Sequence, residues 1–218
     1  MAIEVTTKDC TALTDAEMGD MADLSAASLG WQAGLLSKQA EEWVLVSQAF
    51  DKGKLRGFVF STLERIGGTP ALIIGIGCVG RVRNRSSVLK ALMAEQLHKT
   101  LMAFPDEDVI VAARLIDPGA AEAFSGLSDI RPWPDTRPNG EERAWGRRLA
   151  KRYQTIDFSD RTMQGASEDT LLVLDHEALK SHEIAAVFSD CRPEVGHHMI
   201  TWGWAMAEFL ERYHTPKH

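Results

Sequence analysis

A short basic loop between an apolar run and a helical pattern is the feature of this sequence best suited to chemistry. The residues concerned are Arg81, Arg83, Asn84, Arg85, Ser86 and Ser87. The first N–H groups of a helix are unpaired and its N-terminus carries positive partial charge, so this place binds anions well. The junction therefore predicts an anion site. The alternative is that the arginines only solvate a turn and the serines only cap the helix.

The elements around the loop would hold it rigidly. Residues 71–79 (ALIIGIGCV) are almost purely apolar and predict a strand covered on both faces. The pattern over 86–104, with Ser86 or Ser87 as cap, predicts a long helix. Residues 108–116 predict a second buried strand, parallel to the first because a helix joins the two. A short helix begins at Asp117-Pro118.

The residues before this unit predict helices and hairpins. Thr14-Asp15 is a helix cap, and the helix ends near Gly30, while 31–42 favours helix over loop. Strand-like runs at 43–50 and 55–63 are separated by turns, so that with 71–79 they form a three-stranded antiparallel meander.

This order of elements resembles the GNAT superfamily of acyl-CoA-dependent N-acyltransferases over residues 10–135. The family's loop reads Arg/Gln-x-x-Gly-x-Gly/Ala, and residues 81–86 fit the spacing with Asn84 and Ser86 at the glycine positions. The family's Asn-x-x-Ala-x-x-x-Tyr pattern is met by residues 117–124, which end in Phe124. The resemblance implies an α/β (α+β) fold, with a mixed, mostly antiparallel sheet flanked by helices.

The resemblance also implies a ligand. The backbone of residues 83–88 would bind the pyrophosphate of acetyl-CoA or another acyl-CoA. The residues implied in binding are Val79, Arg81, Arg83, Asn84, Arg85, Ser86, Ser87, Asp117 and Phe124. The implied activity is acyl transfer to an amine acceptor; the alternative is a non-catalytic module that binds acyl-CoA or a protein partner.

Catalytic groups are harder to assign. Phe124 stands where the family often has a tyrosine that reprotonates the CoA thiolate, and it has no hydroxyl. Residues 71–80 contain no acid and no histidine. The candidates for a base acting through water are Glu42, Glu64 and Asp117. A backbone N–H around Gly77–Val79, near Cys78, would stabilise the oxyanion. The Cys78 thiol itself is better explained as a core group than as a nucleophile.

The second part of the chain is less regular. Residues 131–140 are Pro-rich, 141–153 predict a helix, 171–174 and 198–202 predict short strands, and 204–213 predict a last helix. We expect 1–135 to be the acyl-CoA-binding core and 136–218 an extension packed on it, not an independent domain. The arginines of the 141–153 helix are expected on a solvated face, paired with Glu141 and Glu142.

Composition excludes several classes of protein. Lys+Arg number 24 and Asp+Glu 31, a net charge of −7, which disfavours nucleic-acid binding. Three cysteines are too few for a disulfide framework. The Asp, His and Cys residues of 175–198 match no zinc spacing, and no metal is expected. With a polar N-terminus and no apolar run of about 20 residues, we expect a soluble cytoplasmic protein, either a monomer or a homodimer.

Overall fold

The structure is a computed structural model that describes residues 3–26, 30–168, 173–177 and 182–214. Its strands are β1 (Glu4–Asp9), β2 (Leu45–Asp51), β3 (Lys54–Ile66), β4 (Thr69–Val79), β5 (Val109–Leu115), β6 (Ser128–Arg131), β7 (Ile156–Ser159), β8 (Gln164–Ala166), β9 (Leu174–Asp175) and β10 (His197–Ala205). Its α-helices are α1 (Asp15–Ser25), α2 (Ala33–Glu42), α3 (Arg85–Ala103), α4 (Gly140–Arg152) and α5 (Ala207–Leu210). Short 3₁₀ segments are η1 (Cys10–Ala12), η2 (Pro118–Phe124), η3 (Glu183–Phe188), η4 (Pro193–Val195) and η5 (Glu211–Tyr213).

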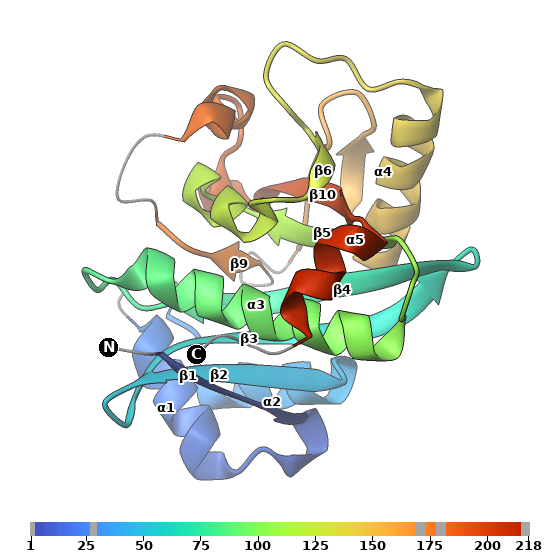
Figure 1. Cartoon of the computed structure of the whole chain (residues 1–218). Coiled ribbons are helices and arrows are strands. Elements are labelled where there is room, and N and C mark those ends of the chain that lie inside the picture. The colour runs from blue at the N-terminus through green and yellow to red at the C-terminus, as the bar shows by residue number, and fades with distance from the viewer. Residues whose placement is uncertain (1–2, 27–29, 169–172, 178–181, 215–218) are drawn as a thin grey trace.

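All the described strands belong to one mixed sheet, in the order β1-β2-β3-β4-β9-β5-β10-β8-β7, with β6 also paired to β10 (Figure 1). Most neighbours are antiparallel, whereas β4, β5 and β9 are mutually parallel. The predicted meander of β2, β3 and β4 is confirmed, as is the parallel pairing of β4 with β5. The fold class is therefore the mixed, mostly antiparallel architecture expected.

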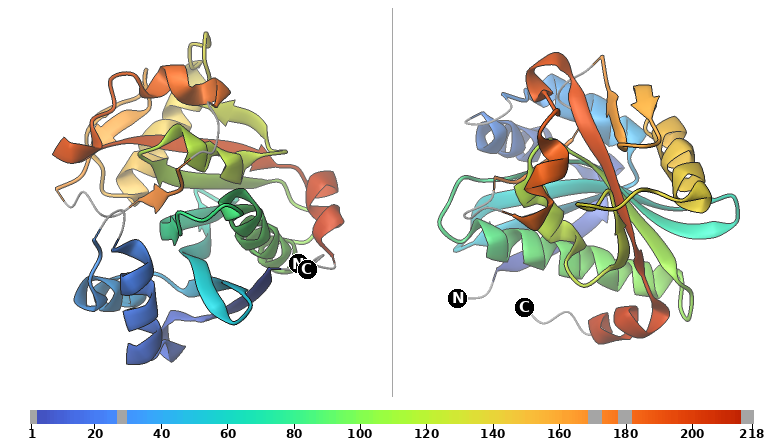
Figure 2. Two further views of the ribbon diagram at one scale, coloured as in Figure 1. Left: turned by 90° about the vertical axis from the view of Figure 1, so that its left-hand side faces the viewer. Right: turned by 90° about the horizontal axis from the view of Figure 1, so that it is seen from above.

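Helices cover both faces of the sheet and create two apolar cores (Figure 2). On one face α3, η2 and α5 pack on the sheet; on the other, α1, α2 and α4 do so. The second core includes a close approach at Gly75, where a Cβ atom would lie 2.3 Å from the Trp43 ring. A glycine is therefore required there for the indole to approach β4 this closely.

Several element predictions need correction. β1, β6, β7 and β8 were not predicted. Trp204 belongs to β10 rather than to the last helix, which is reduced to α5 and η5. Residues 171–172 of a predicted strand lie outside the described residues, and β9 begins at Leu174. The cap of α1 is confirmed, because Thr14 and Glu17 form a capping box. The cap of α3 is Asn84, not Ser86 or Ser87.

The basic face of α4 pairs with residues outside the helix. Arg143 and Arg147 both bind Asp160, and Glu142 binds Arg131 instead of the arginines of its own helix that were expected to pair with it. The guanidinium of Arg148 lies 4.8 Å from the centre of the Trp145 ring. These pairs join α4 to the β6 and β7 regions.

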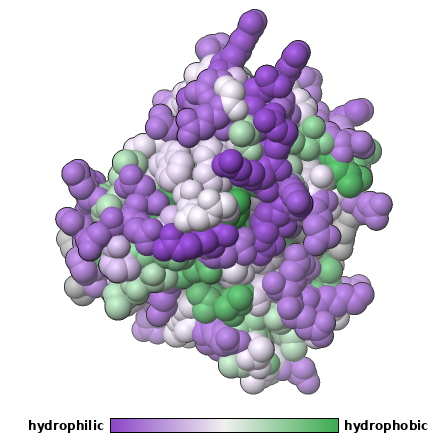
Figure 3. All heavy atoms as spheres, turned by 90° about the vertical axis from the view of Figure 1, so that its right-hand side faces the viewer, coloured by the Kyte–Doolittle hydropathy of each residue, from purple (hydrophilic) through white to green (hydrophobic). Residues whose placement is uncertain are grey.

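The surface seen in Figure 3 is mainly hydrophilic, with small separate apolar patches. The large apolar side chains exposed among the described residues are Val44, Met102, Ile156, Val195 and Met206. Homodimerisation stays a prediction. None of the described helices combines the length and apolarity needed to cross a membrane.

His198 on β10 predicts a pH dependence of stability. Its side chain is 1% exposed, its Nε2 shares a hydrogen bond with Thr155 Oγ1 (3.0 Å), and burial lowers its pKa to about 4. The unfolded imidazole takes up a proton near pH 6.5, but the folded one does not until about pH 4. Unfolding therefore binds a proton in this window, so the contribution of His198 to stability is constant above pH 6.5 and falls below it.

We expect His198 to account for a loss of about 2 kcal/mol in the free energy of unfolding between pH 7.5 and 5. Urea unfolding of the native protein and of His198→Gln at both pH values measures this difference. Equal losses in the two proteins would show that His198 does not titrate as a buried neutral group.

Candidate functional site

The central parallel strands of the sheet pair at one end and part at the other. Residues Ala71–Ile73 of β4 pair with Ile110–Ala112 of β5, and beyond them the two strands separate. β9 lies in the space between them: Leu174 pairs with both Gly77 and Leu115. We call this space, bounded by residues 77–79 and Leu115, the β4–β5 gap (Figure 1).

Tyr153, which follows α4, marks the point where the strands part. Its hydroxyl lies 2.9 Å from the carbonyl oxygen of Ile74 and 2.8 Å from that of Ala112, so its proton is shared between β4 and β5. The ring is buried against the Arg114 guanidinium, 4.9 Å from the ring centre, and burial raises the pKa of the phenol. Tyr153 thus remains a neutral donor at the closed end of the gap.

The predicted basic loop lies at the open end of the gap, where β4 leads into α3. Within it, the Arg85 N–H donates to Val82 O and the Val82 N–H to Gly80 O. Asn84 occupies the N-cap position of α3, but its side chain donates to Asp51 (3.4 Å) instead of bonding to the helix N–H groups. The Ser86 hydroxyl donates to Glu122 (3.4 Å). The structure therefore brings residues 81–87 to one helix N-terminus, as the loop pattern predicted.

The anionic partners of this loop come from residues 173–177. Arg81 Nη2 lies 3.1 Å from Asp175 Oδ1, and Arg81 Nε lies 3.4 Å from Glu177 Oε2. Arg85 Nε donates to the Glu177 carbonyl oxygen at 2.6 Å. In the sequence, Asp175 was considered only because aspartate is one of the residue types that can bind a metal ion. In the described ranges, no three His, Cys, Asp or Glu side chains lie close enough together to hold a metal ion.

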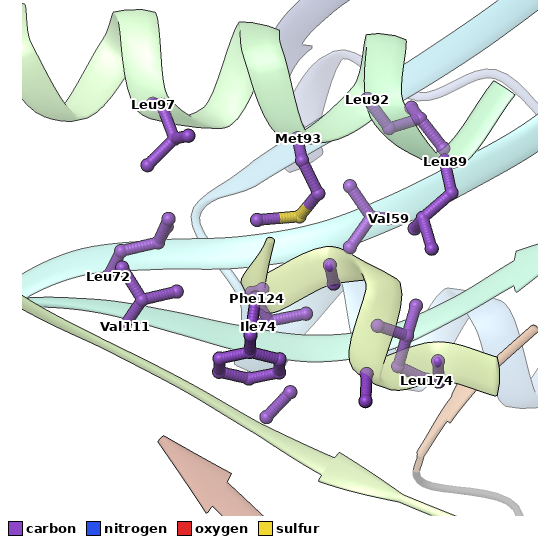
Figure 4. Close-up of a cluster of buried hydrophobic side chains, with 14 of the residues drawn as sticks. Val59, Leu72, Ile74, Leu89, Leu92, Met93, Leu97, Val111, Phe124 and Leu174 are labelled. Atoms are coloured by element: carbon purple, nitrogen blue, oxygen red, sulfur yellow. The ribbon is translucent and has the colours of Figure 1, made fainter. Parts of the chain in front are cut away.

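A pocket of about 400 Å³ lies between α3 and η2, next to the loop. Its lining comprises Ser86, Lys90, Ala121, Glu122, Phe124, Ser125, Gly126, Ile130, Trp133 and His182. Phe124 forms its floor: the residue is fully buried in the same core as Ile74 and Leu174, below α3 (Figure 4). Asp117 caps η2 by accepting from the Gly119 N–H at 2.6 Å. Phe124 therefore lies beneath α3, whereas Asp117 is engaged as the cap of η2.

A larger pocket, about 590 Å³, lies on the opposite side of the loop, beside α1. It is lined by Asp20, Asp23, Leu24, Phe50, Gly53, Lys54, Leu55, Arg56, Gly80, Arg81 and Val82. Sequence reasoning missed Asp20 and Asp23. Their spacing of three residues places both carboxylates on one face of α1, and this spacing could have indicated an acidic helix face from the sequence.

Two candidate bases are placed away from the loop. Glu64 pairs in register with Ala71 at the start of β4, roughly 26 Å along the strand from Val79 at about 3.3 Å per residue. Its carboxylate is bound by Arg152 at 2.6 Å. Glu42 ends α2, where its carboxylate accepts from Gln39. The structure does not bring Glu64 to the gap, and Glu42 lines neither pocket beside the loop.

The backbone of β4 offers its N–H groups alternately to its two neighbours. The Gly80 N–H donates to Arg56 O on β3 (2.8 Å), whereas the Gly77 N–H donates to Val173 O (3.1 Å). By this alternation the Cys78 N–H faces β3, and that of Val79 faces the gap. Of the N–H groups expected to stabilise an oxyanion, those of Gly77 and Val79 therefore face the gap, and that of Cys78 faces away from it.

The Cys78 thiol is buried and is not placed as a nucleophile for an exposed substrate. Its side chain is 1% exposed, and Sγ lies 3.9 Å from Asp175 Oδ2. His176, the next residue of the segment, is fully buried, with Nδ1 3.2 Å from Gly119 O. Burial lowers the pKa of His176, so the imidazole is neutral where it contacts η2.

Comparison with known proteins gives partial structural likenesses. No protein-family description and no curated protein sequence matches this chain. The aminoglycoside 6'-N-acetyltransferase from Enterococcus faecium is 12% identical over 51% of this chain, with a TM-score of 0.40, and the match spans 61% of that protein, less than two thirds of its length. An aminoglycoside 6'-acetyltransferase type Ii is 14% identical (61% and 88% of the two chains, TM-score 0.41).

A GNAT family acetyltransferase from Brucella melitensis, solved in complex with acetyl-CoA, is 14% identical over 50% of this chain and 75% of its own, with a TM-score of 0.37. The strand order itself, rather than these partial likenesses, defines the architecture. The chain has the mixed, mostly antiparallel sheet flanked by helices that its resemblance to the GNAT superfamily implies, with β9 of its own chain between β4 and β5.

Proposed function

We propose that this protein binds an acyl-CoA and transfers its acyl group to an amine. The observation that supports this most strongly is that two features coincide: β4 and β5 part at the same end of the sheet where the basic loop opens α3. The loop supplies N–H groups and arginines for a diphosphate. The gap supplies backbone groups for an extended chain that carries amides. An acyl-CoA contains both a diphosphate for the loop and an extended, amide-bearing arm for the gap.

The present occupant of the gap supports the proposal, because an extended chain with amide groups fits there. The peptide of residues 173–175 lies along β4 and donates and accepts as a parallel strand does. The arm of CoA also carries amides and is narrower than a peptide with side chains. The pocket between α3 and η2, with Lys90 at its edge, would accept the remainder of the nucleotide.

In the proposed reaction the neutral amine attacks the thioester carbonyl, the nitrogen loses a proton to water and the carbon–sulfur bond breaks, giving an amide and the CoA thiolate. The Gly77 N–H, which points into the gap, would donate to the developing oxyanion. Phe124 provides no acid, so water returns a proton to the thiolate, whose ordinary pKa makes it an acceptable leaving group. The pocket beside α1 would hold the acceptor, with Asp20 and Asp23 attracting a protonated amine and accepting its proton through water.

One observation favours a second function, a module that binds acyl-CoA or a protein without catalysis. The Gly77 N–H is already bonded to Val173, and the candidate base Glu64 is far from the loop. Release of free thiol from acetyl-CoA over a panel of amines separates the two functions. Binding without thiol release identifies the module, and binding with release identifies the enzyme.

Charge reversal in the loop tests the binding site. We expect Arg83→Glu to weaken acetyl-CoA binding at least tenfold in titration calorimetry, because it places a negative charge beside the diphosphate. Arg83 is chosen because Arg81 and Arg85 also bind residues 173–177. Lys38→Glu, the same type of charge change on an exposed residue of α2, is the control and should bind as the native protein does. Equal binding by both variants would remove the loop from the proposed site.

A further inference from the structure

We propose that residues 173–177 are a built-in competitor of acyl-CoA, held in the β4–β5 gap by the same groups that would bind the ligand. This inference rests on the proposed function. It adds that acyl-CoA binds only when the segment leaves the gap. The segment is thus an autoinhibitory contact within the chain, and three sets of contacts support it.

The first set is the backbone and its apolar side chain. Val173 O accepts the Gly77 N–H, the donor proposed for the oxyanion, so the two uses of this group are mutually exclusive. Leu174 is 1% exposed and belongs to the apolar core beneath α3. A Cβ atom on Gly77 would lie 2.9 Å from Leu174 Cδ1, so the glycine leaves room for this side chain. The segment fills the gap as a strand fills a sheet.

The second set concerns charge. Asp175, whose side chain is 3% exposed, and Glu177 both bind Arg81, while Arg85 binds the Glu177 carbonyl. Two carboxylates and a carbonyl therefore lie against the cationic loop, where a diphosphate would otherwise lie. The oxygen atoms of a carboxylate pair and of a diphosphate both accept charge-assisted hydrogen bonds from guanidinium groups. The segment consequently reproduces the anionic part of the ligand as well as its extended arm.

The third set links the segment to η2. The fully buried His176 ring contacts Gly119, one of the residues that the Asp117 cap organises. With Arg81 on one side and η2 on the other, the segment joins both walls of the site. A ligand that follows β4 toward the pocket between α3 and η2 would have to cross this segment. Binding of acyl-CoA and occupation of the gap by residues 173–177 therefore exclude each other.

With competition of this type, the apparent Kd equals the Kd of the open site divided by the fraction of molecules in which the site is open. Asp175→Ala removes the ion pair to Arg81 without changing any residue of the loop. We expect it to lower the apparent Kd for acetyl-CoA at least tenfold in titration calorimetry. Asp160→Ala is the matched control: this acid also pairs with arginines, but on α4, and its removal should leave the Kd unchanged.

A reversible lock provides a second measurement that does not depend on weakening the fold. Cys78 and Asp175 are register partners on adjacent strands, with their side chains in contact, so Asp175→Cys places two thiols within the range of a disulfide. Oxidation joins the two sulfur atoms and transfers two electrons and two protons to an added oxidant such as diamide. Peptide mapping identifies the bond, and thermal unfolding shows whether each form is folded.

We expect the reduced Asp175→Cys protein to bind acetyl-CoA at least as tightly as the native protein, and the oxidised form to lose binding more than tenfold, with full recovery after reduction. Equal binding by the oxidised and reduced forms would overturn the inference while leaving the proposed function intact. A Kd for Asp175→Ala equal to the native value would do the same. If the native protein, Asp175→Ala and reduced Asp175→Cys are all folded and none binds millimolar acetyl-CoA, the proposed function is overturned, and this inference with it.

Discussion

A chain that ends at Asp135 is expected to be insoluble or to lack a cooperative unfolding transition. It would lose β10, which pairs with the whole of β5 from Met199–Leu115 to Ala205–Val109. The edge of β5 would then be open. One face of the sheet would lose the apolar side chains of β10 and its cover by α4. Size-exclusion chromatography and thermal unfolding of the purified fragment measure the effect.

The matched control is a chain that ends at Tyr213, which keeps every described strand and is expected to fold as the full chain does. A soluble fragment of residues 1–135 with a sharp thermal transition would contradict the prediction. It would also show that the second part of the chain is an addition to a self-sufficient domain. The division into a core at 1–135 and a dependent extension stays a prediction until that measurement.

Tyr153→Phe is expected to lower the free energy of unfolding by about 2 to 3 kcal/mol, because the carbonyl oxygens of Ile74 and Ala112 lose a buried donor. The substitution keeps the ring and its contact with Arg114. The effect should therefore come from the hydroxyl alone. Equilibrium unfolding in urea, with the m-value compared between variants, measures it.

Tyr213→Phe is the control for Tyr153→Phe, since Tyr213 is only partly buried and its ring packs on Phe209. We expect a change of less than about 0.5 kcal/mol there, as for ordinary surface substitutions. Similar losses for the two variants would mean that the Tyr153 hydroxyl does not hold β4 and β5 at the point where they part.

The parts of the fold that the sequence predicted are those with strong local patterns. The apolar run of β4, the i+4 leucines of α3 and the Thr14 cap each carry enough local information to be recognised. β1 was missed because its residues are mostly polar and its stability comes from pairing with β2. Trp204 reads as part of a helix, but seven residues of pairing with β5 determine its structure.

The candidate site divides in the same way. The basic loop is contiguous, so residue type and spacing were sufficient to predict it. Its partners Asp175 and Glu177 are more than ninety residues away, and nothing local in their sequence connects them to Arg81. β9 has two residues, which is too short to produce a periodic signal. What occupies the site is thus decided by long-range pairing, which only the structure shows.

The position of β10 has a consequence for synthesis of the chain on the ribosome. β5 leaves the ribosome roughly 80 residues before β10 does, an interval of about 4 to 16 s at ordinary elongation rates. During that time β5, which is buried along its whole length in the folded protein, lacks its antiparallel neighbour β10. The nascent chain therefore presents an apolar strand edge for seconds, which makes early contact with a chaperone an advantage for this protein.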